Sequence, residues 1–233
     1  MKKLLLIFTG LAIMSLLGAQ SLQEIVTRYT VANKLDRVSS LKTILITGNM
    51  SMMGMQLPVT MWMKNPDKIK ILTDINGQSM VQVFDGINGY TVNPMSGSSA
   101  PVEMTSDEVK QTLRANMFQN YMAAYLKKGH LGLEGEEKVN DKPSFRLKAT
   151  TEEGTVIYFF IDKASYLMTK ISTTASQGGM TMKIDAFPSD YTETNGFMIP
   201  MKTTTSAQGM QIEMNFTKVE VDNPMDDSIF KIN

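Results

Sequence analysis

Short segments with a two-residue repeat run through most of this chain, and they limit its possible folds more than any other feature. In 210–216, apolar side chains occupy the even positions and polar side chains the odd ones, as in a strand with one buried face and one wet face. The segments expected to form strands are 41–50, 55–64, 67–74, 79–85, 88–93, 131–139, 143–151, 154–162, 165–175, 179–187, 197–208 and 210–221. Their separators are short, which favours antiparallel hairpins because parallel strands need long crossovers. About ten or more such strands are too many for a flat open sheet, so we expect the sheet to curl.

The phase of the last expected strand slips, because its apolar positions become odd-numbered at Val219 and Val221. This slip predicts a β-bulge near Thr217-Lys218. No linker or repeat divides the sequence. We therefore expect 20–233 to form a single α+β domain.

Two helices should accompany the sheet, over about 22–39 and 106–128. Ser21 with Glu24, and Thr105 with Glu108, have capping-box spacing, and Gly129 stands where a helix-ending glycine belongs. The second helix has a wide apolar stripe that consists of Leu113, Met117, Phe118, Tyr121, Met122, Tyr125 and Leu126. Such a stripe could form a movable lid over a cavity, hinged at the Gly/Ser loop 95–99, or it could pack permanently in an ordinary core.

The N-terminal residues have the pattern of a secretory signal peptide. A basic start, Met1-Lys2-Lys3, precedes the apolar run 4–17, and the small residues Gly18 and Ala19 follow it. We expect cleavage after Ala19 or Gln20, which assigns 1–19 to the signal and leaves an exported, soluble chain. The apolar run is short for a membrane span, and an uncleaved anchor is the alternative.

Composition excludes several classes of function. The chain has 23 basic and 23 acidic residues, and this balance argues against a nucleic-acid partner. It has no cysteine and a single histidine, His130, so neither a thiolate nucleophile nor a multi-histidine metal site is available, and we expect no metal and no cofactor. His130 follows a helix-ending segment and reads as a solvated imidazole, while Glu134, Glu136 and Glu137 read as a solvated face. Because no nucleophile elbow or phosphate loop is present, the chain is not expected to be an enzyme.

Methionine is the unusual component, with 21 residues. Its flexible, polarizable side chain suits surfaces that contact irregular apolar partners. The strand pattern predicts inward-pointing pairs, namely Met53 with Met55, Met61 with Met63, Met180 with Met182, and Met210 with Met214. A concave sheet lined in this way would hold acyl chains. The alternatives are ordinary core packing and a copper(I) site at 50–55, since thioethers are soft ligands.

Short motifs also recur along the chain in a definite order. They are Leu35-Asp36-Arg37-Val38-Ser39-Ser40-Leu41, Met61-Trp62-Met63-Lys64-Asn65-Pro66, Val83-Phe84-Asp85-Gly86 with Tyr90 and Asn93-Pro94, Gly132-Leu133-Glu134-Gly135, Ile161-Asp162, Asp190-Tyr191 with Ile199-Pro200, and Asn223-Pro224 with Asp226-Asp227-Ser228-Ile229-Phe230. In this order they resemble the LolA/LolB-type lipoprotein-sorting family. The resemblance spans nearly the whole chain after the signal peptide.

That resemblance implies an unclosed antiparallel β-barrel whose concave side is covered by helices. It also implies a soluble periplasmic monomer that takes acylated lipoproteins from an inner-membrane releasing transporter to an outer-membrane acceptor. In many members of the family an arginine before the proline of the basic-x-Pro turn holds the helical lid shut. This chain has Asn65 at that position, so the same latch is not expected.

The residues expected to contact lipid are Met61, Trp62, Met63, Leu113, Met117, Tyr121, Met182, Ile184, Met210, Ile212, Met214 and Phe216. Trp62 would face the cavity if Met61 does not, because neighbouring strand residues point to opposite faces. The function expected from these residues is lipoprotein carriage between the two membranes. The alternative is a LolA-like lipid-binding or envelope-stress sensor module with no role in lipoprotein sorting.

Overall fold

The computed structural model describes residues 20–97, 99–177 and 180–232. The expected signal peptide, 1–19, lies outside the described residues. Within them, no helix combines the length and the apolar character that a membrane crossing requires.

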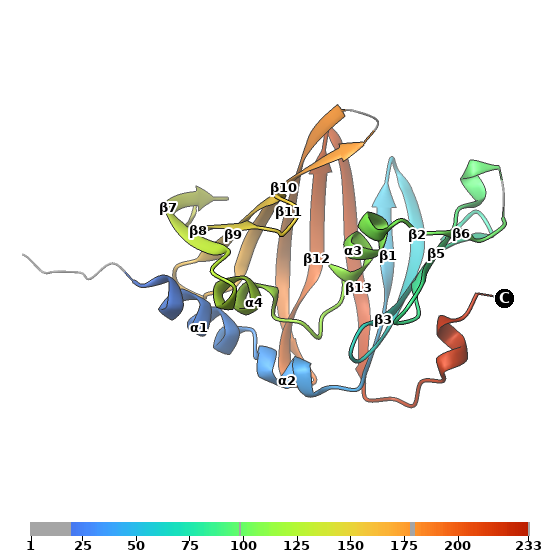
Figure 1. Cartoon of the computed structure of the whole chain (residues 1–233), viewed down its shortest axis with the longest axis horizontal. Helices are drawn as coiled ribbons and strands as arrows, with labels where there is room; N and C mark the ends of the chain where they lie inside the picture. Colours follow the sequence, from blue (N-terminus) through green and yellow to red (C-terminus); the bar gives the residue numbers. More distant parts are fainter. Residues whose placement is uncertain (1–19, 98, 178–179, 233) are drawn as a thin grey trace, which may run out of the picture.

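The described residues form one thirteen-stranded antiparallel sheet that curves around a layer of helices (Figure 1). The strands are β1 (Thr43–Met52), β2 (Met55–Lys64), β3 (Lys68–Ile75), β4 (Gln78–Phe84), β5 (Gly89–Val92), β6 (Val102–Glu103), β7 (Leu131–Val139), β8 (Lys142–Thr150), β9 (Val156–Asp162), β10 (Met168–Gln177), β11 (Met180–Thr194), β12 (Phe197–Ala207) and β13 (Met210–Val221). Each expected strand overlaps one of these, and β6 is an addition too short to leave a pattern. The expectation of a curved, unclosed antiparallel sheet is confirmed, with β6 and β7 at its two edges.

The sheet consists of two meanders that meet at one junction. From the centre outwards, β1 to β6 follow one another on one side and β13 to β7 on the other, so the first strand pairs with the last. The predicted bulge lies at this junction, where Thr47 is opposite Lys218 and Gly48 is opposite Phe216, leaving Thr217 as the extra residue. A Cβ atom at Gly48 would lie 2.2 Å from the carbonyl oxygen of Asn215. Glycine is therefore required at position 48, where the bulged strand β13 approaches the backbone of β1.

The first expected helix is divided into α1 (Leu22–Ala32) and α2 (Leu35–Ser40). Ser21 caps α1 by accepting a hydrogen bond from the backbone N–H of Glu24. The break follows from Asn33, whose side chain donates to the carbonyl oxygen of Tyr29, and from Lys34, which has a left-handed φ of 53°. Asparagine competes locally for backbone groups and so favours helix ends over helix interiors.

The second expected helix is also wrong as a single element. It forms α3 (Ser106–Leu113) and α4 (Tyr121–Lys127), separated by the linker 114–120. The capping box of Thr105 and Glu108 is present at the start of α3, and Gly129 has the left-handed conformation expected after α4. Two asparagines divide the segment, because Asn116 bonds within the linker and Asn120 caps α4 by accepting from Ala123 N–H. Short 3-10 turns, η1 (Pro94–Ser96) and η2 (Asp227–Phe230), complete the described elements.

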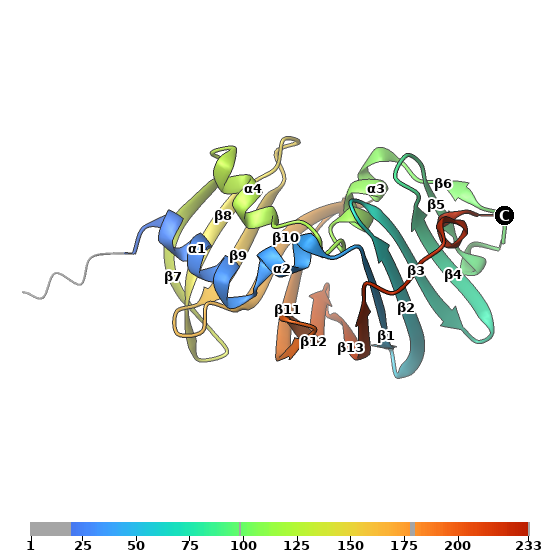
Figure 2. The same cartoon turned by 90° about the horizontal axis from the view of Figure 1, so that it is seen from below.

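The helices lie on the concave side of the sheet (Figure 2) and pack into two apolar clusters. The β1-side cluster joins α2 and the linker to the inner face of β1, β2, β3, β4 and β12; its buried members are Val38, Leu41, Ile44, Ile46, Val59, Met61, Met63, Ile69, Phe84, Phe118, Phe197 and Ile199. The β8-side cluster joins α1 and α4 to the inner face of β7, β8, β9 and β10; its buried members are Ile25, Val26, Met122, Leu131, Phe145, Leu147, Ala149, Ile157, Phe159, Ile161 and Met168. The sheet is thus held against its helices in two separate places, and the space between them holds the candidate site.

Candidate functional site

An apolar cavity, here called the inner cavity, lies where the two clusters meet. Its volume is about 300 Å³, which is the small end of the range for ligand cavities. Helices α1, α2 and α4 and the linker form one side, and strands β9 to β12 form the other. The lining residues are Tyr29, Asn33, Leu35, Val38, Met117, Gln119, Asn120, Tyr121, Met122, Phe159, Met168, Ile171, Ala186, Pro188, Tyr191, Met198, Pro200 and Thr203.

Three tyrosines from different elements reach this cavity. Burial raises the pKa of Tyr29 and of Tyr121 to about 12, and it also raises the pKa of Tyr191. The Tyr191 hydroxyl donates to the carbonyl oxygen of Met168 at 3.0 Å. The phenols are therefore uncharged at neutral pH, so the inner cavity offers aromatic and thioether surface with a few neutral polar groups.

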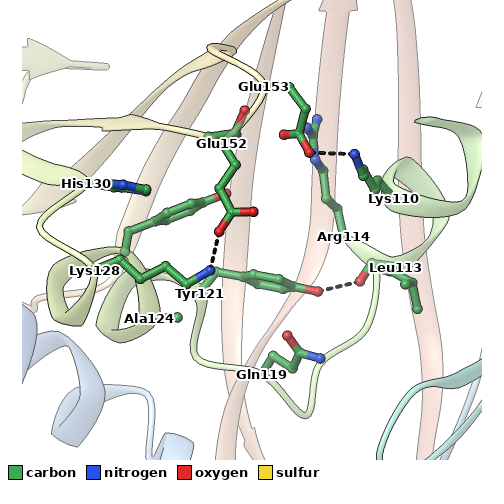
Figure 3. Close-up of a pocket in the computed structure, with 12 residues that line it drawn as sticks. Lys110, Leu113, Arg114, Gln119, Tyr121, Ala124, Lys128, His130, Glu152 and Glu153 are labelled. Carbon is green, nitrogen blue, oxygen red and sulfur yellow. Dashed lines mark hydrogen bonds and ion pairs between the residues drawn. The ribbon is translucent and has the colours of Figure 1, made fainter. Parts of the chain in front are cut away.

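A second hollow, here called the outer cavity, opens beside the first and also measures about 300 Å³ (Figure 3). It lies between α3, α4 with the residues that follow it, and the hairpin that joins β8 to β9. Its lining is much more charged and consists of Lys110, Leu113, Arg114, Gln119, Tyr121, Ala124, Tyr125, Lys128, His130, Thr151, Glu152 and Glu153.

Two ion pairs tie both helices to this hairpin. Lys110 of α3 pairs with Glu153, and Lys128 at the end of α4 pairs with Glu152; we call the two pairs the ion-pair clasp. The hydrogen bond from Lys110 lowers the pKa of Glu153 to about 2, and the hydrogen bond from Lys128 lowers the pKa of Glu152. All four side chains are exposed, so water and salt weaken these pairs.

Tyr121 separates the two cavities. Its side chain lines both of them, as does that of Gln119. Its hydroxyl donates to the carbonyl oxygen of Leu113 at 2.6 Å, which joins the start of α4 to the end of α3 across the linker (Figure 3). Tyr121 and Gln119 thus form the wall between the cavities, and one hydrogen bond holds the Tyr121 side chain.

The linker is anchored to the sheet by a buried asparagine. Asn116 is 2% exposed; its side-chain amide donates to the carbonyl oxygen of Pro66 at 3.0 Å, and its side-chain oxygen accepts from Phe118 N–H at 2.9 Å. Asn65, which precedes the proline of the turn after β2, donates to the carbonyl oxygens of Ser39 and Leu41. It therefore holds the end of α2, and the hydrogen bond between the linker and the sheet comes from Asn116.

The structure brings only some of the expected lipid-contacting residues together. Met117 and Tyr121 line the inner cavity, and Leu113 lines the outer one. Met61 and Met63 face inward but are packed in the β1-side cluster. Trp62 alternates with them and pairs with Leu45 and Lys70 on the opposite face. Of the two expected orientations of this strand, the structure therefore has the one in which Met61 faces inward.

The remaining expected residues lie on β11 and β13, where Ile184 lines a hollow shared with α3, and Met214 and Phe216 pack against the β1-side cluster. Met182, Ile184, Ile212, Met214 and Phe216 are half-buried there. Met210 is 55% exposed at a hairpin end, and Met53, expected to point inward, sits in a turn and is 80% exposed. The pairing of Met53 with Met55 was wrong because the turn between β1 and β2 interrupts the alternation there.

Most of the inner-cavity lining was missed from the sequence. Met168, Tyr191 and Met198 belong to strands that had been recognised, but nothing in a strand pattern shows which part of a strand the helices cover. Met122 belongs to the apolar stripe of the second expected helix, and Tyr29 lies within the first expected helix. One signal could have indicated these residues. Methionine and aromatic side chains occur both on the apolar stripes of the helices and at the strand ends against which the helices pack.

His130 is also less solvated than expected. It is half-buried in the wall of the outer cavity, and its Nδ1 atom is buried without a hydrogen-bond partner among the described residues. Within those residues, no group of three or more His, Asp or Glu side chains is arranged to hold a metal ion.

Comparison with known proteins identifies the fold. No protein-family model and no curated protein matches the sequence. Among solved structures, a LolA superfamily protein from Nitrosomonas europaea is 12% identical, with 92% of this chain and 99% of that chain covered and a TM-score of 0.60. A protein described as an outer membrane lipoprotein-sorting domain, from Vibrio parahaemolyticus, is 12% identical over 90% and 97% of the two chains, with a TM-score of 0.60.

A DUF1329 family protein from Desulfovibrio piger is 14% identical over 89% of this chain and 97% of that chain, with a TM-score of 0.59. At these identities the likeness concerns the fold alone. The chain therefore has the LolA-like open barrel, as its motifs indicated.

Proposed function

We propose that this protein is a non-enzymatic periplasmic carrier, which shelters acyl chains of lipoproteins or lipids and moves them from the inner to the outer membrane. The observation that carries the proposal is the inner cavity, an apolar space between the helices with their linker on one side and a curved sheet on the other. Support also comes from the LolA-like fold, which this chain shares with the protein described as an outer membrane lipoprotein-sorting domain. Its partners would be an inner-membrane releasing transporter and an outer-membrane acceptor, with the carrier itself a monomer.

The energetics require such a cavity. Each methylene group that leaves an apolar environment for water costs about 0.8 kcal/mol, so an acyl chain must stay covered throughout transfer. The inner cavity as described has about the volume of ten water molecules. That space suits part of one chain, and a lipoprotein with several acyl chains would need the helices to move outward.

The linker and the two short helices suit that movement. Their polar contacts are the Asn116 hydrogen bond, the Tyr121 hydrogen bond and the ion-pair clasp. Phe118 of the linker and Met122 of α4 are also buried in the two clusters, so outward movement must withdraw these two side chains. Outward movement of α3 would expose the half-buried concave surface at Met182, Ile184, Ile212 and Met214. We propose that these residues extend the lipid-binding surface in the loaded state.

Filling the inner cavity tests the proposal. Ala186 is a small residue of β11 in the cavity wall, so Ala186→Phe should block the space and lower the affinity for a fluorescent acyl probe by about tenfold or more. The matched control is Ala164→Phe, which changes the same residue type at an exposed position in the turn between β9 and β10, outside the cavity lining. Equal binding by both variants and the unmodified chain would show that the inner cavity is not the site.

Mass spectrometry of molecules that co-purify from the native envelope separates carriage in sorting from the alternative. Acylated lipoproteins would support the sorting role. Free phospholipid or glycolipid would favour a lipid-binding module, and a protein without bound lipid, whose deletion leaves lipoprotein release unchanged, would contradict the sorting role.

A further inference from the structure

The outer cavity has more cationic than anionic side chains in its wall, and acyl-chain binding does not explain this excess. Its wall carries the cations Lys110, Arg114 and Lys128 against the carboxylates Glu152 and Glu153. Each carboxylate is already paired with one of the lysines. Asp107, the nearest further acid, lies 3.9 Å from Lys110 on the same helix.

Arg114 is left as the cation without a partner. Arg114 lines the outer cavity and also a neighbouring hollow whose lining includes Asp107 and Glu153. Its guanidinium forms no hydrogen bond or ion pair with any described residue. Figure 3 shows it beside the ion pair of Lys110 with Glu153, on the side of the opening away from His130. His130 adds a buried Nδ1 atom that also lacks a hydrogen-bond partner among the described residues.

The position of these groups relates them to the inner cavity. The floor between them is apolar, formed by Leu113, Ala124 and the rings of Tyr121 and Tyr125. Tyr121 is at the same time the wall of the inner cavity. Gln119, which is exposed, is the other residue that lines both cavities. A molecule with an apolar chain and a polar head could therefore place its chain in one cavity and its head in the other by displacing the side chains of Tyr121 and Gln119.

We infer that the outer cavity binds the anionic headgroup, a carboxylate or a phosphate, of an amphiphile whose acyl chain occupies the inner cavity, with Arg114 as its main contact. The inference rests on the proposed function and specifies its ligand. A planar guanidinium binds carboxylate or phosphate through two parallel hydrogen bonds. A headgroup in this position would also compete with Glu153 and Glu152 for the lysines, so that loading would loosen the clasp on both helices.

The test compares ligands that differ only in their headgroups. Displacement of a fluorescent acyl probe from the full chain would be measured with hexadecyl carboxylate, phosphate, alcohol and trimethylammonium. At least one of the two anions should bind about tenfold more tightly than the alcohol, because a hydrogen bond to a charged group strengthens binding by about that factor. The stronger of the two anions identifies the headgroup class.

Two variants assign the effect to its residue. Arg114→Gln should lower the affinity for the preferred anion to that for the alcohol and leave the alcohol unchanged. Lys127→Gln removes one positive charge from the neighbouring turn of α4, outside the outer cavity, and should preserve the preference. Circular dichroism and urea unfolding would establish that both variants are folded.

The possible failures are distinguishable. Equal affinity for the alcohol and both anions would overturn the inference and leave the proposed function standing, because the acyl chain would still bind. An anion preference that survives Arg114→Gln would overturn the assignment of the headgroup site to the outer cavity. If no amphiphile displaces the probe, the proposed function fails and the inference fails with it.

Discussion

The inner and outer cavities have similar volumes and share the side chain of Tyr121, yet their walls are built in different ways. The inner wall collects residues from three helical elements, a linker and four strands. The outer wall comes from one continuous segment, 110–130, and one hairpin, 151–153. The fold as a whole therefore specifies the apolar space, whereas two local segments specify the charged one.

The same difference predicts how each cavity responds to its surroundings. The inner wall depends on burial, which salt does not screen. The outer wall depends on exposed charges, which salt screens strongly. Three perturbations can break or sharpen this contrast.

The largest effect is expected where both cavities share a support. Asn116→Ala should lower the free energy of unfolding by about 1–3 kcal/mol, because it leaves the Pro66 carbonyl oxygen and the Phe118 N–H without their partner in a buried place. Urea unfolding measures the loss. Gln119→Ala, an exposed change on the same linker, should stay within about 0.5 kcal/mol of the unmodified chain. Equal stability of the two variants would contradict the role of Asn116 as the anchor.

The second effect belongs to the inner cavity alone and appears in alkali. Burial raises the pKa of Tyr29 from 10.0 to about 12, so the folded chain keeps a proton that the unfolded chain releases. Stability should be unaffected by this group below pH 10 and should fall between about pH 10 and pH 12. Urea midpoints across that range measure the fall. Tyr29→Phe should make it shallower, and an identical fall in this variant would contradict the assignment to Tyr29.

The smallest effect belongs to the outer cavity and depends on the charge of Glu153, which is lost only in acid. The pKa of Glu153 is lowered from 4.5 to about 2 by the hydrogen bond from Lys110, so its contribution is present above pH 4.5 and is lost as the pH falls towards 2. Glu153→Gln should speed hydrogen exchange of the α3 amides at neutral pH and low salt. The difference from the unmodified chain should disappear at high salt, and a difference that persists there would show that the clasp is not electrostatic.

The sequence predicted the sheet better than the helices for a local reason. Twelve strands and the bulge at Thr217 follow from a two-residue alternation that burial on one face imposes throughout. The helix pattern at 22–39 and 106–128 is equally regular, but Asn33, Asn116 and Asn120 divert backbone hydrogen bonds to side chains. A periodic apolar stripe gives no sign of this competition between side-chain and backbone hydrogen bonds.

The candidate site was predictable only in kind. The methionine content indicated an adaptable apolar surface, and Met117 and Tyr121 do line the inner cavity. Met168 and Met198 were missed, while Met182 and Met214 were placed in the lining, because the position of the helices along the strands decides which methionines are covered. That position depends on packing between elements distant in sequence, such as α1 with β10.

The junction of β1 with β13 has a consequence for how the molecule folds. Nearly every other strand pairs with a neighbour in the chain, so each meander can form from local contacts, but Ile44 must find Val221 across almost the whole described sequence. Closing so long a loop carries the greatest entropic cost and makes this contact a late one in folding. Until β13 arrives, both meanders expose a long central edge capable of pairing with another chain. The completion of the last strand therefore protects the protein from self-association as well as finishing its sheet.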